Sequence, residues 1–74
     1  MNTNNPINDE TLRQFKQQYW PQTKHYLRLG QAFLNFFDIG HPWPELFYCE
    51  NQGKSEAMIR EYLENLQYDW YKVL

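Results

Sequence analysis

The sequence predicts an all-α fold, a small bundle of about three helices at about residues 9–20, 22–38 and 55–70. Apolar residues recur at spacings of three and four in each stretch, which places them on one face of a helix. No pair of runs alternates apolar with polar residues as two partner strands would. The hydrophobic fraction of 42% and the charged fraction of 22% are typical of chains that fold.

The first helix is expected to begin at the acidic pair that opens with Asp9, because negative charge suits the positive end of the helix dipole. Leu12, Phe15 and Tyr19 then share one face. Pro21 should stop or restart this helix, since proline lacks an amide donor but fits a first helical position, so a kinked or broken pair is expected.

The second helix, about 22–38, is apolar around much of its circumference, as a central helix would be. Gly30 lies inside it and costs roughly 1 kcal/mol of helix propensity relative to alanine. We interpret this glycine as a point of close approach to another backbone, against the alternative of a tolerated defect. Gly40 is expected to end the helix.

A proline-rich turn at 41–44 precedes a short ambiguous segment, 45–50, which fits either one helical turn or a short strand. We favour the turn, because a lone strand would have no partner.

Ser55 is the expected N-cap of the last helix. The predicted core takes residues from the second and last helices: Phe33, Phe37, Ile59, Leu63 and Leu66, with Trp70 continuing the last stripe.

The chain of 74 residues suffices for one domain and not for two, since independent cores need roughly 50 residues or more. Residues 1–8 are Asn-rich and polar, so we expect a flexible lead-in with nothing to bury. A single helical domain is expected over 9–74.

Aromatic residues are abundant: three Trp, six Tyr and five Phe make up 19% of the chain. Three short helices can hardly cover that many rings, so we expect a homodimer or a surface that a partner covers. The alternative is that the rings pack into a dense core within one chain.

Cysteine and hydropathy patterns favour a cytoplasmic protein that does not associate with membranes. One cysteine cannot form an internal disulfide, and no apolar run approaches the roughly 18 residues of a membrane span. The N-terminus also lacks the basic and apolar regions of a signal peptide.

The sequence contains few residues that indicate an enzyme active site. Cys49 with His25 or His41 is the only candidate for a nucleophile and base, and the local signatures of thiol enzymes are missing. Cys49 is expected to be a buried free cysteine. The sequence shows neither the paired spacings of zinc modules nor a glycine-rich phosphate loop, so we expect a non-enzyme without metal or cofactor.

Charge is divided unevenly along the chain, whose formal net charge is −2. Residues 38–74 carry seven acidic side chains against three basic ones. The acidic last helix forms either a solvated surface or a docking surface for a basic partner, and its acidic residues are Glu56, Glu61, Glu64 and Asp69. Basic and aromatic side chains interleave in the first half, and this face is the candidate for nucleic-acid binding: Arg13, Lys16, Lys24, Tyr26 and Arg28.

The run from Arg28 to Asn35, followed by Phe47-Tyr48, resembles small uncharacterised proteins of bacteriophages and prophages, which share an Arg-x-Gly-Gln-x-x-x-Asn run and a later Phe-Tyr. The resemblance covers residues 28–48. It implies a phage-type or prophage-type accessory protein in a bacterial cytoplasm and assigns no catalytic residue.

Two groups of residues are candidates for an interaction surface. Arg28, Gln31 and Asn35 share one helix face, where they serve either recognition or the capping of the following turn. Tyr68 and Tyr71 fall off the apolar stripe of the last helix and form either a contact surface or packing over the first helix.

Together these patterns predict a non-enzymatic accessory protein that binds a host or phage protein, with itself as one candidate partner. The alternative is a small nucleic-acid-binding regulator that uses the basic and aromatic face over 13–28.

Overall fold

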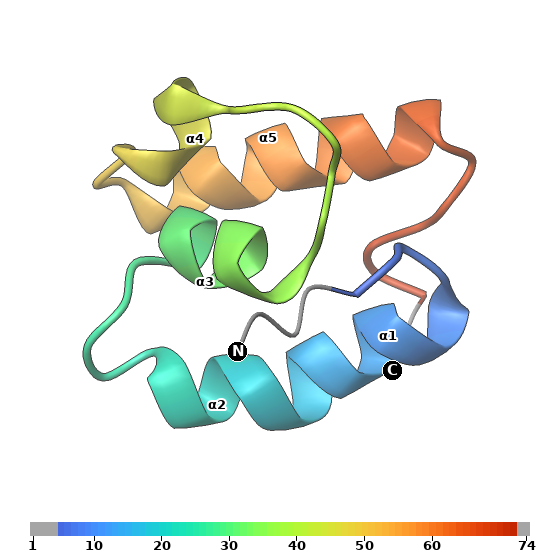
Figure 1. The fold of residues 1–74 in the computed structure, drawn as a ribbon, viewed down its shortest axis with the longest axis horizontal. Coiled ribbons are helices and arrows are strands. Elements are labelled where there is room, and N and C mark those ends of the chain that lie inside the picture. The colour runs from blue at the N-terminus through green and yellow to red at the C-terminus, as the bar shows by residue number, and fades with distance from the viewer. Residues whose placement is uncertain (1–4, 73–74) are drawn as a thin grey trace.

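The computed structural model describes residues 5–72 and confirms the all-α fold. Figure 1 shows three layers: a helical run at the bottom, α3 in the middle, and α5 at the top beside α4. The elements are α1 (Asp9–Gln14), η1 (Phe15–Tyr19), α2 (Trp20–Thr23), α3 (Leu29–Phe36), α4 (Pro44–Phe47) and α5 (Gln52–Asn65).

The first helical run is continuous from α1 through α2, so the break expected at Pro21 is wrong. The π-helical turn η1 precedes the proline, and the Trp20 N–H donates to the carbonyl of Phe15, five residues earlier. A proline inside an α-helix clashes with the carbonyl four residues before it, here that of Gln17. The wider π turn displaces that carbonyl, and the run continues to Thr23.

Residues 5–8 are held against the domain, which corrects for these residues the expectation that 1–8 form a flexible lead-in with nothing to bury. The Asn5 N–H donates to the Phe36 carbonyl at 2.9 Å, and the Asp38 N–H donates to the Asn5 carbonyl at 3.0 Å. Ile7 packs against the core, and Asn8 caps α1. Residues 1–4 and 73–74 lie outside the described residues.

Helix α3 is shorter at both ends than the predicted range of 22–38. The N–H groups of Tyr26 and Leu27 both donate to the Thr23 carbonyl, which closes a turn before α3 begins. At the other end Phe37 adopts an extended backbone and pairs with Asn5, so the helix stops before Gly40 is reached.

Gly30 is a point of close approach, as predicted. A Cβ built on it would lie 2.1 Å from the backbone carbonyl oxygen of Leu46 in α4. The ambiguous segment that contains Leu46 is also a helical turn, as predicted, and its proline stands at the N-terminal end of the helix.

Replacing Gly30 with alanine should destabilise the domain by about 1–3 kcal/mol, because backbone atoms cannot move aside as a flexible side chain can. Gly53 is the matched control, since it lies in α5 and a Cβ added there would meet only a side-chain oxygen of Asn51, 3.4 Å away. Gly53→Ala should stabilise by up to about 1 kcal/mol through helix propensity. Urea unfolding measures both variants, and equal effects would contradict the assignment of Gly30.

Helix α5 begins earlier than predicted. Asn51 is its N-cap, with the side-chain oxygen accepting from the Lys54 N–H at 2.9 Å. Ser55, the expected cap, lies inside the helix and is buried.

The end of α5 also differs from the prediction, since the helix stops at Asn65 rather than near residue 70. Gln67 has a φ of +69°, the Tyr68 N–H donates to the Leu63 carbonyl, and the Gln67 N–H donates to the Glu64 carbonyl. This is a Schellman motif, and it reverses the chain direction. Leu66 lies at the cap and is 44% exposed, so its assignment to the core is wrong.

The other predicted core residues are buried: Phe33, Phe37, Ile59, Leu63 and Trp70. Trp70 enters the core by the chain reversal rather than by extending the helix. Its ring centroid lies 6.2 Å from that of Phe15, and its Nε1 donates to a Glu56 carboxylate oxygen at 3.2 Å.

Candidate functional site

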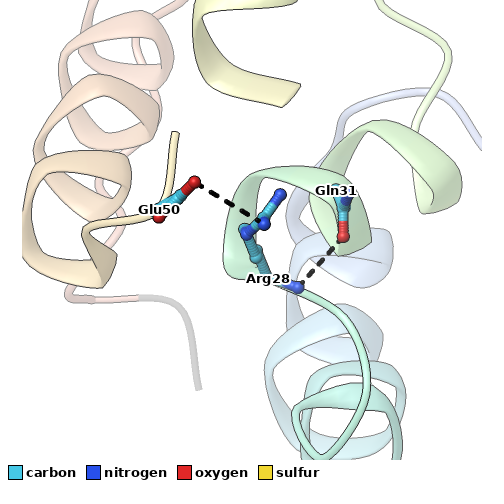
Figure 2. A network of polar contacts seen from close by, with 3 residues as sticks. All are labelled: Arg28, Gln31 and Glu50. Carbon is cyan, nitrogen blue, oxygen red and sulfur yellow. Dashed lines mark hydrogen bonds and ion pairs between the residues drawn. The ribbon is translucent and has the colours of Figure 1, made fainter. Parts of the chain in front are cut away.

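The structure joins two of the predicted interaction residues at the start of α3. The Gln31 Oε1 accepts a hydrogen bond from the Arg28 backbone N–H at 3.3 Å, and an Arg28 guanidinium nitrogen lies 3.9 Å from a carboxylate oxygen of Glu50 (Figure 2). Gln31 therefore satisfies an orphan donor at the beginning of its own helix. The turn that follows the helix, which we expected it to cap, lies at the opposite end.

The remaining predicted interaction residues lie apart from this pair. Asn35 is exposed near the end of α3. Tyr68 is half-buried and packs against the core, whereas Tyr71 is exposed near the C-terminal end of the described chain.

The predicted nucleic-acid face is interrupted at Lys16. Its Nζ donates to the Trp70 carbonyl at 2.5 Å and lies 4.8 Å from the centre of the Trp70 ring. Burial lowers the pKa of the Lys16 ammonium, against the opposing influence of the Glu56 and Asp69 carboxylates. This lysine therefore anchors the C-terminal segment.

The rest of that face is exposed but mixed in charge. Arg13 shares a shallow hollow with Asp9 and Asp69. Lys24 and Tyr26 are solvent-exposed after the end of α2, and Tyr26 is 72% exposed.

A groove of about 560 Å³ lies between the end of α3 and α4. We call it the α3–α4 groove. Its lining is mostly apolar and aromatic, with a few polar groups: Leu34, Asn35, Phe37, Asp38, Ile39, Gly40, His41, Pro42, Trp43, Pro44, Phe47 and Tyr48. Pockets of this size and composition are typical of ligand and peptide sites.

The loop that forms one wall of the groove is fixed by local bonds. An Asp38 carboxylate oxygen accepts from the Gly40 N–H at 3.0 Å, and Gly40 takes a φ of +83°, which favours glycine. Prolines at 42 and 44 restrict the backbone on both sides of Trp43. A wall held in this way loses little conformational entropy on binding.

Aromatic contacts position the rings of the groove. Trp43 packs against Tyr62 of α5, with ring centroids 5.1 Å apart. Phe47 and Tyr48 meet edge to face at 5.0 Å. Tyr48 remains 69% exposed, so a flat, amphipathic ring faces solvent beside the groove.

Sequence reasoning placed one residue of this groove among the candidates, Asn35, and missed Trp43, Phe47 and Tyr48. The available signal was the alternation of proline and aromatic residues over 42–48, which we interpreted only as a rigid turn followed by a helical turn.

Groups that could carry chemistry are dispersed. Among residues 5–72, no three His, Cys, Asp or Glu side chains come together as metal ligands. Cys49, expected to be buried, is half-buried. In the same part of the chain, no helix is both long and apolar enough to cross a bilayer.

Comparison of the chain with protein-family models, with curated proteins and with solved structures found no match.

Proposed function

We propose that this chain is a non-enzymatic accessory protein of the phage or prophage type, which binds a segment of another protein in the α3–α4 groove. The observation that carries the proposal is an aromatic concavity of about 560 Å³ with a preorganised wall. Aromatic anchors in well-packed pockets supply most of the binding energy at protein interfaces.

The charge around the groove favours a partner segment with basic residues. Asp38 lines the groove, and Glu45 is exposed beside Pro44. These carboxylates belong to the acidic second half of the chain, with seven acidic side chains against three basic ones. The partner is thus a short segment with an apolar or aromatic anchor flanked by Lys or Arg.

The phage-type resemblance over residues 28–48 also supports this assignment, because that range includes α3, the loop and α4. The Asn of its motif is Asn35, and its Phe-Tyr pair is Phe47-Tyr48, all three of which line the groove.

Tyr48→Ala should reduce affinity for such segments at least about tenfold, because truncating an aromatic hot spot removes more than about 1.4 kcal/mol. Tyr26→Ala is the matched control, since this tyrosine is similarly exposed and lies outside the groove. The probes are peptides selected against the wild-type chain from a random displayed library. Fluorescence anisotropy measures their affinity for the three proteins.

The selection has a second expected result, enrichment of aromatic or aliphatic residues beside Lys or Arg. Equal affinity of the selected peptides for Tyr48→Ala and Tyr26→Ala would contradict the assignment of the groove as the binding site. Mixed DNA or RNA that binds in low salt, and loses affinity in Tyr26→Ala instead, would favour the nucleic-acid alternative. Sedimentation equilibrium at micromolar concentration detects the homodimer. If Tyr48→Ala abolished such a dimer, the segment bound in the groove would belong to a second copy of this chain rather than to a different protein.

A further inference from the structure

A second, smaller hollow of about 130 Å³ lies at the N-terminal end of α5, where the start of α3 approaches it. Its lining includes the thiol of Cys49, the hydroxyl-bearing Ser55, and the cationic residues Lys24 and Arg28. Cys49 is the single cysteine of the chain and is half-buried.

Ser55 is the unusual residue of this hollow. This residue is 1% exposed, and its Oγ has no hydrogen-bond partner among residues 5–72. Buried hydroxyls nearly always find a partner, so an unpaired one at a cavity wall needs an explanation. A negatively charged acceptor in the hollow would supply it.

Cys49 is placed to become that acceptor. The Ser55 hydroxyl is the largest influence lowering the pKa of the Cys49 thiol, although no hydrogen bond of standard geometry joins the two groups while the thiol is protonated. Burial and the Glu50 carboxylate act to raise this pKa, while the Asn51 backbone and the Lys54 charge lower it. The neutral thiol donates to the Asn51 carbonyl at 3.5 Å.

We propose that Cys49 acts as a reactive thiolate that forms a mixed disulfide with a small anionic disulfide. The thiolate sulfur attacks one sulfur of the reagent and forms a new S–S bond to Cys49. The S–S bond of the reagent breaks, its second sulfur leaves as a thiolate with the electron pair, and that thiolate takes a proton from water. The reagent disulfide is the oxidant. Its leaving sulfur is reduced to a thiol, and the Cys49 sulfur is oxidised as it enters the mixed disulfide.

The charges around the sulfur favour an anionic reagent. Lys24 and Arg28 line the hollow together with Glu50, and Glu45 and Lys54 line the adjoining concavity on the other side of Cys49. Three cations therefore oppose two carboxylates. The Arg28 to Glu50 distance is 3.9 Å, and the two side chains are 45% and 81% exposed, so a carboxylate of the reagent can compete for the guanidinium.

Ser55→Ala tests the hydroxyl without disrupting the fold, because removing an unpaired buried hydroxyl leaves no partner unsatisfied and alanine favours a helix. Thermal unfolding should give a melting temperature equal to or above that of the wild type. This control separates a chemical role for the hydroxyl from a structural one.

The experiment follows the mixed disulfide with oxidised glutathione by mass spectrometry of the intact protein between pH 5 and pH 10. The apparent pKa of the wild-type pH–rate profile should lie below the ordinary thiol value of about 8.5, and Ser55→Ala should raise it. Lowering a thiol pKa by one gives about ten times more thiolate at neutral pH, and reduced nucleophilicity limits the gain in rate to about threefold. We therefore expect Ser55→Ala to react more slowly at pH 7, by a factor smaller than its loss of thiolate.

Charge preference is tested with cystamine, a cationic disulfide, against oxidised glutathione. Lys24→Gln should lower the rate with oxidised glutathione relative to cystamine. Lys72→Gln removes the same charge outside the hollow and should leave the ratio unchanged. Cys49→Ser, which lacks the thiol, gives the background level of modification. A wild-type apparent pKa at or above about 8.5, no change in Ser55→Ala, or a faster reaction with cystamine would each overturn the proposal.

Discussion

Phe15→Ala is expected to remove most of the free energy of unfolding of the domain. Phe15 is fully buried, and its ring contacts those of Tyr19, Phe33, Phe36, Phe37 and Trp70, with centroids 5.5 to 6.2 Å away. Truncating a buried phenylalanine costs about 3–5 kcal/mol. Native domains are stable by about 5–15 kcal/mol, and small ones lie near the lower end of that range.

Urea unfolding followed by far-UV circular dichroism measures this loss. Phe15→Leu is the matched control, because it keeps most of the volume and should cost about 1.5 kcal/mol or less. A midpoint for Phe15→Ala close to that of the wild type would contradict the placement of Phe15 at the centre of the ring cluster.

The helical class and much of the core could be predicted because both depend on local spacing. Phe33 and Phe37 stand four residues apart, as do Ile59 and Leu63, and all four side chains are buried. The close approach at Gly30 could be predicted for a related reason, because a glycine inside an apolar helix commonly marks close packing against another segment.

Helix ends depended on contacts between residues distant in the sequence, which spacing does not record. Phe37 leaves α3 because it pairs with Asn5, 32 positions earlier. Pro21 stays in its helix because η1 widens the turn before it. Gln67 closes a Schellman motif with a positive φ, a position where glycine is the usual signal.

The groove was mostly missed for the same reason. It joins the end of α3, a loop and α4, and Trp43 is placed by Tyr62, a residue of α5. Sequence spacing groups residues along single helix faces, which can predict Asn35 but not a concavity built from three segments. Likewise, Lys16 belongs to a basic pattern in the sequence but binds the chain's own Trp70 in the fold.

Leu63→Ala should destabilise the domain by about 2–5 kcal/mol, because the leucine side chain is fully buried where α5 packs on the core. Leu66→Ala makes the same chemical change three residues later, at a side chain that is 44% exposed beyond the end of α5. It should cost less than about 1 kcal/mol, since little of the lost surface was shielded from water. Thermal and urea unfolding of both variants measure the difference. Equal losses would mean that α5 continues past Asn65 with Leu66 turned inward, as the apolar stripe alone predicts, and that the Schellman motif does not end the helix.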